Sequence, residues 1–596
     1  MTTRAAIQKA YIAFFNRPAD PEGLVWWEQQ IAKAGGDMAA IINAFSASNE
    51  YKELYAGKTH AEVVNQLYQN LFGRNAEAGG LAFWTDALAK GKVNVGNIAY
   101  AMTAGAQNDD AKVVANKVEV AEVFTKELDT PEEIESYNGS AVAQAVRAFL
   151  AGIDASDRSV LAAKGAVAAQ VKAVLAKGPK VSPGETFTLT AGADTVTGTR
   201  GNDTVVATRE TLTAQDKIDG GRGTDTLSMG AADAAALAGG TVFATSVSGF
   251  ERLAIGPVGA ATALDMAKVD DIAQLAVAGV TAGGLTVTNL ASGGTLELTA
   301  AVAAASSVAV KNAATGTADV LTLKLAATDG FANTAAVTVA DVETINIVTD
   351  DTDTTAATTA FKAMLNAGQA KTVTVSGDAG VDLTGSTLTA ATLIDGSGIT
   401  ATGAGGKLTV AAASLATTGV TVKGGAGDDQ ITGNSAAGKV DTLSGGAGND
   451  TLTGGSGNDI LSGDGGKDSL TGGSGTDTFV IGVPATGAQY DTITDAAAGD
   501  TIRLVDRGTE TFAAAKVSLD AGATFQDYLN AAATGDGSVN SAISWFQFDG
   551  NTYVVQDRSA GASFVDNADV VVELTGLVDL GTAKLGGTSG AELTLA

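Results

Sequence analysis

The chain contains 596 residues, of which 66 are acidic and 37 are basic, and its net charge of −29 argues against nucleic acid and anionic lipid as partners. It has no cysteine, so no disulfide supports the fold. No run of about 18 strongly apolar residues occurs, so no membrane span is expected, and the length predicts several domains with cores of their own.

Residues 1–177 are predicted to form a helical domain, because apolar residues recur there at helical spacing. Within this domain a segment recurs after 57 residues, and the residues identical in both copies are Tyr11 and Tyr68, Phe15 and Phe72, Arg17 and Arg74, Gly23 and Gly80, Leu24 and Leu81, and Trp27 and Trp84. The repeat predicts one helical hairpin used twice, with its aromatic side chains in the core rather than around a ligand. The only histidine, His60, is expected to be an exposed helical residue.

The periodicity of the sequence changes after the helical domain. Gly178, Pro179, Pro183 and Gly184 are predicted to end the last helix. Residues 178–423 then alternate with period two in short segments, which predicts an all-β region of many short strands. The clearest segments are 285–290, 295–300, 320–325, 337–341 and 371–377.

Near the start of this β region, between residues 189 and 228, lie three glycine-containing units of nine residues: LTAGADTVT, GTRGNDTVV and GGRGTDTLS. They place Asp194, Asp203 and Asp225 at the sixth position of the unit, and a thirteen-residue insertion precedes the third. These three aspartates are candidate metal ligands.

Residues 424–480 repeat the same unit in a continuous run: GGAGDDQIT, GNSAAGKVDTLS, GGAGNDTLT, GGSGNDILS, GDGGKDSLT and GGSGTDTFV. The second unit carries three extra residues, and the fifth has Asp464 where glycine is usual. Glycines allow a tight turn with φ > 0, and the following x-apolar-x segment forms a short strand whose apolar residue points inward. Two units therefore make one coil of a parallel β-roll.

Stacked coils bring the sixth-position aspartates into two columns. Asp429, Asp450 and Asp468 are expected on one side of the roll, and Asp441, Asp459 and Asp477 on the other. Neighbours in a column lie about 4.8 Å apart, where two carboxylates repel by roughly 3–4 kcal/mol at an effective dielectric near 20. The roll therefore needs cations between its turns.

Ca²⁺ is the expected cation, because it is a hard ion that takes many oxygen ligands. Carboxylates and turn carbonyls would supply them, and the turn glycines assigned to the sites are Gly425, Gly427, Gly446, Gly448, Gly455, Gly457, Gly473 and Gly475. Extracellular modules bind Ca²⁺ at roughly 10⁻⁴–10⁻³ M, so such sites would be empty in a cytosol and filled outside. The start of the chain lacks a signal-peptide pattern, which leaves either a cytosolic location or export by a route that reads no N-terminal signal.

Residues 481–596 lose the glycine repeat and are predicted to be ordinary β sequence with aromatics, including the segment TFQDYLNAAATGDG at 524–537. Gln547, Phe548, Asp549 and Gly550 are predicted to form a hairpin turn between strands at 545–548 and 552–555. An open β-roll would expose an edge and its apolar inside, so this segment is expected to cap it.

From about residue 183 to the end, the chain resembles the calcium-dependent crystalline surface-layer proteins of Gram-negative bacteria that a type I (ABC transporter) system exports. The resemblance is carried by residues 249–253, 342–347, the nonapeptides from Gly424, residues 493–504 and, above all, residues 528–580. The nonapeptides alone are typical of the whole RTX class. The N-terminal region resembles a different family, a helical domain of unassigned function (DUF4214-like) that occurs in secreted, repeat-containing bacterial surface proteins.

The resemblance implies a protein that is secreted, lies on the outer-membrane surface and forms a hexameric lattice of identical subunits held by Ca²⁺ within and between chains. It also implies an uncleaved export signal for the type I apparatus in roughly the last hundred residues, and attachment through the N-terminal domain to lipopolysaccharide O-antigen. Because the N-terminal domain resembles a different family, another surface glycan and a lattice contact stay open as its ligand.

Two other classes of function compete with a structural surface protein. A secreted RTX enzyme is disfavoured, because the chain contains no H-E-x-x-H, G-x-S-x-G or phosphate-binding Gly-rich motif, although glycosidase chemistry by two carboxylates is not excluded by counting. A non-crystalline RTX adhesin or extracellular matrix protein is the main alternative, and the sequence separates it poorly from a lattice former. We therefore expect no enzyme, but a self-assembling surface-layer protein.

Overall fold

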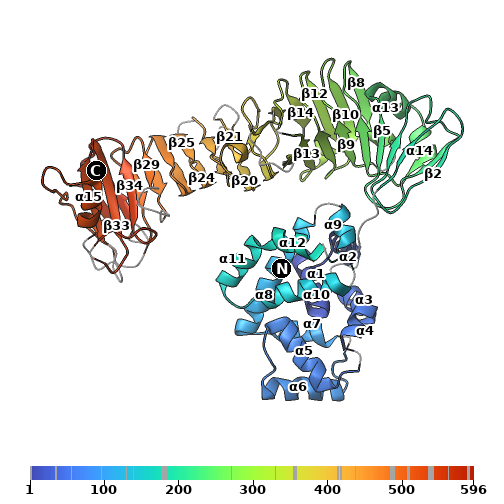
Figure 1. Ribbon diagram of the computed structural model, residues 1–596, viewed down its shortest axis with the longest axis horizontal. Coiled ribbons are helices and arrows are strands. Elements are labelled where there is room, and N and C mark those ends of the chain that lie inside the picture. The colour runs from blue at the N-terminus through green and yellow to red at the C-terminus, as the bar shows by residue number, and fades with distance from the viewer. Residues whose placement is uncertain are drawn as a thin grey trace. The chain divides into compact units, whose positions relative to one another are not determined.

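The computed structural model describes residues 3–596 except 34–36, 56, 96, 129–130, 139, 176, 178–183, 270–271, 329, 353–358, 412–414, 416–418, 436–437, 483–489, 507–509, 534–541, 562 and 587–590. The chain forms two compact units, a helical one up to Gly184 and a strand-rich one from Glu185 (Figure 1). Gly178, Pro179 and Pro183, predicted to end the last helix, lie outside the described residues.

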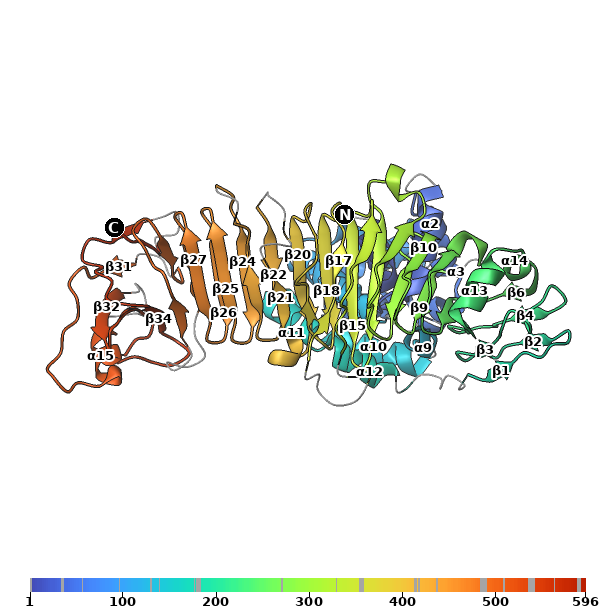
Figure 2. The same ribbon diagram turned by 90° about the horizontal axis from the view of Figure 1, so that it is seen from above.

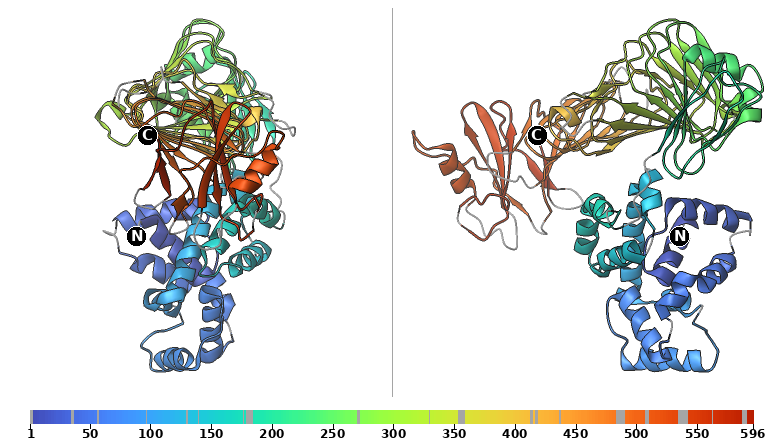
Figure 3. Two further views of the ribbon diagram at one scale, coloured as in Figure 1. Left: turned by 90° about the vertical axis from the view of Figure 1, so that its left-hand side faces the viewer. Right: turned by 45° about the vertical axis from the view of Figure 1, so that its right-hand side comes forward.

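The first unit contains helices without strands among its described residues (Figure 3, blue to cyan). Its helices are α1 (Thr3–Phe15), α2 (Pro21–Lys33), α3 (Ala39–Ala47), α4 (Asn49–Tyr55), α5 (His60–Phe72), α6 (Ala78–Ala89), α7 (Ile98–Gly105), α8 (Asn108–Glu127), α9 (Pro131–Ser136), α10 (Ser140–Ala151), α11 (Asp157–Gly165) and α12 (Val167–Leu175). His60, the first residue of α5, is exposed, as predicted.

The internal repeat corresponds to two helical hairpins, α1–α2 and α5–α6. The repeated tyrosine bonds an acidic residue before the second helix in each copy: Tyr11 donates to Asp20 and Tyr68 to Glu77, both at 3.4 Å. The predicted core position of the aromatics is largely confirmed, since the buried ones are Tyr11, Phe15, Trp27, Tyr68 and Phe72. Trp84 is only half-buried.

The second unit is a β-solenoid, in which each coil adds one parallel strand to a long sheet (Figure 2). In spatial order this sheet contains β1 (Thr186–Thr188), β3 (Thr204–Val206), β5 (Thr226–Met229), β7 (Arg252–Ile255), β9 (Gln274–Val277), β11 (Thr295–Leu298), β13 (Val320–Ala326), β15 (Thr344–Asp350), β18 (Thr372–Gly377), β20 (Leu393–Ile399), β22 (Thr421–Lys423), β24 (Thr442–Ala447), β26 (Ile460–Gly465), β28 (Thr478–Val480) and β30 (Thr501–Arg503). The pairing continues through residue 423 into the nonapeptide run, which begins at residue 424.

The other side of the solenoid consists of shorter sheets placed one after another along the chain. The first contains β2 (Thr195–Thr197), β4 (Lys217–Asp219) and β6 (Val247–Ser248). The second contains β8 (Thr262–Asp265), β10 (Leu285–Leu290), β12 (Ser306–Val310), β14 (Val337–Ala340) and β17 (Leu365–Asn366). The third begins with β16 (Phe361–Lys362), β19 (Val381–Asp382), β21 (Leu408–Val410), β23 (Gln430–Thr432), β25 (Thr451–Ser456), β27 (Ser469–Ser474) and β29 (Asp491–Ile493).

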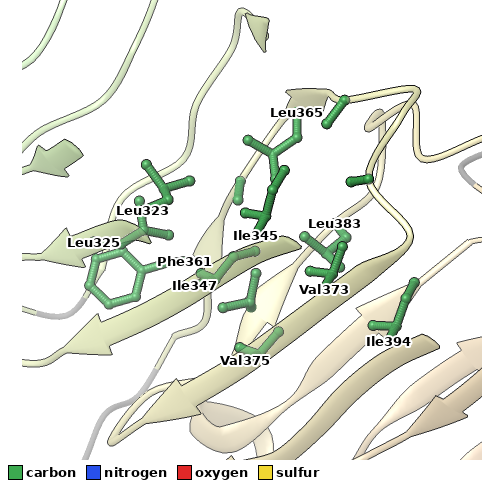
Figure 4. Packing of buried hydrophobic residues seen from close by; sticks show 14 of the residues in the cluster. Leu323, Leu325, Ile345, Ile347, Phe361, Leu365, Val373, Val375, Leu383 and Ile394 are labelled. Carbon is green, nitrogen blue, oxygen red and sulfur yellow. The ribbon is translucent and has the colours of Figure 1, made fainter. Parts of the chain in front are cut away.

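Apolar side chains fill the space between the two sides in registered columns. Figure 4 shows this packing in the middle of the solenoid, where Leu323, Ile347 and Val375 occupy neighbouring strands of the long sheet. In the nonapeptide run every predicted inward residue is buried, namely Ile431, Leu443, Leu452, Leu461, Leu470 and Phe479. Hydrophobic burial therefore supports each coil from within.

The last part of the chain covers the end of the solenoid. The third sheet continues from β29 through β34 (Val570–Leu574), β33 (Asn551–Asp557), β32 (Ala542–Phe548) and β31 (Thr511–Phe512). The long sheet ends with β36 (Glu592–Thr594) and β35 (Lys584–Gly586), both antiparallel. The predicted hairpin is confirmed between β32 and β33, because Asp549 and Gly550 both have positive φ, as a two-residue type I′ turn requires.

The fold class is confirmed, but two stretches predicted to be β are helical. Residues 231–246, in the predicted all-β region, contain α13 (Ala231–Ala238) and α14 (Val242–Ser246), where the alanine-rich sequence favours helix. The prediction of β structure for 524–537 is wrong, since α15 (Phe525–Ala532) begins there. Thr524 and Asp527 form a capping box at its start, a signal that the β interpretation overlooked.

Candidate metal site

The sixth-position aspartates of the nonapeptide run form the two predicted columns. Backbone N–H groups donate from Asp429 to Asp450 Oδ1 and from Asp450 to Asp468 Oδ1, both at 2.7 Å. In the other column they donate from Asp441 to Asp459 and from Asp459 to Asp477, both at 2.8 Å. Each carboxylate therefore binds the backbone of the preceding coil, which keeps the turns in register.

The second oxygen differs among these carboxylates: Oδ2 of Asp429 and of Asp441 accepts a backbone N–H, from Gly425 at 2.7 Å and from Asn434 at 2.6 Å. Oδ2 of Asp450, Asp459 and Asp468 is buried and accepts no hydrogen bond. Within the described residues no lysine or arginine forms an ion pair with any aspartate of the two columns. Because an unpaired buried charge is costly, this arrangement calls for a cation.

Burial also changes the acidity of these groups. It raises the pKa of Asp450 to about 8 and the pKa of Asp429 and Asp459 to about 6, and neighbouring carboxylates add to each rise. Burial likewise raises the pKa of Asp441, Asp468 and Asp477. Without a metal ion, the two columns therefore favour protonation, whereas a bound cation would favour the ionised carboxylates.

The glycines assigned to the sites lie at the ends of the strands or in the turns that join them. Their need for glycine is clearest at Gly446, with φ of 105°, and Gly475, with φ of 142°. A Cβ at either position would overlap a carbonyl oxygen of the preceding coil, from Gly425 and Gly457 respectively. The turns therefore stack backbone on backbone, which leaves carbonyl oxygens and carboxylates in the same layer.

The three aspartates predicted near the start of the β region lie in the same kind of ladder. Glu185 donates its backbone N–H to Asp203 Oδ1 at 2.6 Å, and Asp203 donates to Asp225 Oδ1 at 2.7 Å. Asp225 is fully buried with its Oδ2 unpartnered, and burial raises its pKa to about 6. Asp194 is partly exposed and donates its backbone N–H to Asp216 at 2.7 Å.

The structure adds acidic residues that the sequence reasoning missed. Asp491 and Asp500 extend the two columns of the nonapeptide run. In the N-terminal repeats, Asp216 accepts the backbone N–H of Asp194, and Glu251 accepts that of Asp225 in a separate column. The two C-terminal additions follow coils of 23 residues instead of 18, so a fixed period does not find them.

A further polar column was also missed. Asp428 and Asn449, at the fifth position of their units, accept backbone N–H groups from the next coil at 2.8 and 3.0 Å. The recurring Asn-Asp or Asp-Asp pair in the units was the available signal.

A cation with oxygen ligands fits these ladders. Their buried, unpartnered Oδ2 atoms lie in stacked turns rich in carbonyl oxygens, and Ca²⁺ takes such ligands. In the part of the chain that the structure describes, no group of three His, Cys, Asp or Glu side chains could hold a metal ion by itself. Backbone carbonyls must therefore complete each ligand set, and the identity of the individual ligands stays a prediction.

Segments in both parts of the chain match known protein families. Residues 42–111 match a domain of unknown function, DUF4214. Residues 185–208, 213–231, 420–437 and 444–479 match the RTX calcium-binding nonapeptide repeat. These matches support an RTX-type protein. Repeats of this class bind Ca²⁺ and imply an extracellular or secreted RTX protein.

The matched ranges include Asp203 and Asp225 as well as Asp429, Asp450, Asp459, Asp468 and Asp477, so the N-terminal set lies in RTX repeats as well as most of the main run. No curated protein matches the chain. Among the described helices, none combines the length and the apolar character required to span a membrane.

Proposed function

We propose that this chain is a surface-layer protein that folds when it meets Ca²⁺ outside the cell and then self-assembles into a two-dimensional lattice over the outer membrane. The observation that carries the proposal is the pair of aspartate columns, in which Oδ2 of Asp450, Asp459 and Asp468 is buried without a partner. Such turns are unstable without a cation, so the roll stays loose where calcium is scarce. Four sites at about ten times their dissociation constant would add ~6 kcal/mol, comparable with the stability of a domain.

The proposal of lattice formation is supported by the resemblance of residues 528–580 to lattice-forming proteins and by the charge of the chain. At a net charge of −29 identical subunits repel one another, and Ca²⁺ bridging acidic surfaces would remove that repulsion. In this proposal the protein acts as a structural element and not as an enzyme. The C-terminal region, 481–596, would carry the signal that the type I apparatus reads.

The helical unit is the proposed anchor to lipopolysaccharide or another surface glycan. Its two hairpins expose an aromatic side chain at the same repeat position, Trp26 at 51% and Phe83 at 65% exposure. Each packs edge to face on the next aromatic of its helix, Trp27 or Trp84. Exposed aromatic faces provide apolar contact for sugar rings, and two of them on one unit would strengthen attachment.

Negative-stain electron microscopy of the purified full chain with CaCl2 tests the proposal. We expect ordered two-dimensional sheets that disperse when EDTA is added. Monodisperse particles at every calcium concentration would contradict lattice formation. Calcium-dependent folding without ordered sheets would instead support the alternative, a non-crystalline adhesin or matrix protein. Trp26→Ala combined with Phe83→Ala should leave the sheets intact but reduce binding to cells that display the glycan.

A further inference from the structure

The fifth nonapeptide, residues 463–471, has Asp464 at its second position, where most of the other units have glycine. Glycine occupies this position in the neighbouring coil, where Gly446 pairs with Asp464 across the strands. Asp464 has φ of 65°, a left-handed conformation that a residue with a side chain adopts at an energetic cost. Its carboxylate accepts hydrogen bonds from Ser444 and, at 2.7 Å, from Ser462. An acidic residue is thus held in a turn that favours glycine.

The same turn ends at Asp468, which meets an acidic residue from outside the matched repeats. Asp468 donates its backbone N–H to Asp491 Oδ1 at 3.1 Å. Both side chains are buried, with 1% and 7% exposure, and their carboxyl groups lie close enough to share a hydrogen bond when one is protonated. Asp468 Oδ2 is nevertheless buried without a partner.

Among the described residues, no lysine or arginine side chain forms an ion pair with the carboxyl groups of Asp464, Asp468 or Asp491. The turn contains Lys467, but its ammonium lies over the ring of Tyr490, 5.4 Å from the centroid. Burial raises the pKa of both Asp468 and Asp491, and the charge of Asp464 adds to each rise.

Asp491 connects the roll to the C-terminal cap. It begins β29, which pairs with β27 of the last nonapeptide coils through Thr492 and with β34 of the cap through Asp491 itself. Strand β34 in turn pairs with the β32–β33 hairpin through β33. A ligand held between Asp468 and Asp491 would therefore join the roll to the sheet of the cap.

We propose that Asp468 and Asp491 bind an additional Ca²⁺ at the junction of the roll and the cap, and that Asp464 strengthens this site by adding negative charge. The two buried carboxylates supply direct oxygen ligands, and the ion satisfies Asp468 Oδ2. Filling the site fixes β29 on β27, so folding of the cap depends on calcium together with folding of the roll. This inference rests on the proposed calcium-dependent folding of the nonapeptide run.

The test compares the full chain with Asp491→Asn, and with Asp520→Asn as a control that removes one exposed charge from the same region. Isothermal titration calorimetry with CaCl2 should show that Asp491→Asn binds one ion fewer than the wild type and the control. Hydrogen–deuterium exchange should show that calcium still protects β24 and β26 in this variant but no longer protects the β32–β33 hairpin. In EDTA the hairpin should exchange at the same rate in all three proteins.

Asp464→Gly provides a second variant that suits the backbone at that position. It should fold at least as well as the wild type in EDTA, and the calcium concentration that protects the β32–β33 hairpin should rise about tenfold, as expected for the loss of one nearby charge.

An unchanged ion count and unchanged hairpin protection in Asp491→Asn would overturn the inference and indicate a pair that only shares a proton. Faster hairpin exchange of Asp491→Asn in EDTA would also overturn it, because the effect would then be structural. If calcium protects no strand of the wild-type roll, the proposed function itself fails.

Discussion

Neutralising one aspartate in each column should separate the two roles of these residues, which are to accept a backbone hydrogen bond and to bind a cation. In Asp450→Asn combined with Asp459→Asn, the amide oxygen can still accept the N–H groups of Asp429 and Asp441, which now bond Oδ1 at 2.7 and 2.8 Å. The register of the coils is therefore kept. What disappears is the negative charge at Oδ2, which is buried without a partner in both residues.

The size of the effect follows from these two roles. A site filled at about ten times its dissociation constant contributes ~1.4 kcal/mol, so the loss of two sites lowers the calcium-dependent stabilisation by ~3 kcal/mol. Without calcium the asparagine double variant should be as stable as the wild type or more stable. Burial raises the pKa of both carboxyl groups, which means that their ionised forms cost free energy, and neutral side chains remove that cost. Alanine at both positions should be worse than asparagine under either condition, since each buried N–H left unpaired costs about 1–3 kcal/mol.

Thermal unfolding followed by the β signal in circular dichroism, with CaCl2 and with EDTA at pH 7.5, measures this difference. We expect a smaller calcium-induced rise in Tm for the asparagine double variant than for the wild type, and a Tm in EDTA that is equal or higher. Glu210→Gln combined with Asp520→Asn removes two exposed charges and serves as the control. An equal calcium-induced rise in the asparagine variant and the wild type would refute the assignment of the columns as calcium ligands.

Three further predictions concern pH, the turns and the helical repeat. Because the folded-state pKa of Asp450 is raised to about 8, the calcium-free roll binds more protons than the unfolded chain, so its Tm in EDTA should rise as pH falls from about 8 to about 5, and a falling Tm would contradict this. Gly475→Ala should destabilise the roll by more than about 3 kcal/mol in urea unfolding, whereas Gly165→Ala, in an open helical position, should be neutral or stabilise by up to ~1 kcal/mol. Arg17→Ala breaks a largely buried, two-bond ion pair and should cost the helical unit roughly 3 kcal/mol, while the equivalent Arg74→Ala, at a more exposed pair, should cost at most about 1 kcal/mol, and equal losses would contradict this difference in burial.

The nonapeptide run could be predicted in detail because its period is fixed. Eighteen residues separate Asp450 from Asp468 and Asp459 from Asp477, so the columns, the inward residues and the turns follow from counting. The same counting fails at Asp491 and Asp500, where the coil lengthens to 23 residues and the glycines disappear.

The rest of the solenoid was predicted only as short strands, for a related reason. Between residues 252 and 407 the coils vary in length: 21 residues separate Leu275 from its neighbour in register, Leu296, but 27 separate Leu296 from Leu323. Alternation identifies each strand but does not show that successive strands stack in register. In the cap, α15 was missed because its aromatic residues suggested strands, although Thr524 and Asp527 mark a helix start.

Hydrogen–deuterium exchange of the full chain in CaCl2 and in EDTA tests most directly whether cations hold the acidic turns together. Strands β23 to β28 should be protected in calcium and exchange rapidly in EDTA, while α1, α5 and α8 should exchange equally in both. Equal protection of β23 to β28 in the two conditions would contradict the account, since the stacked carboxylates would then be stable without a cation.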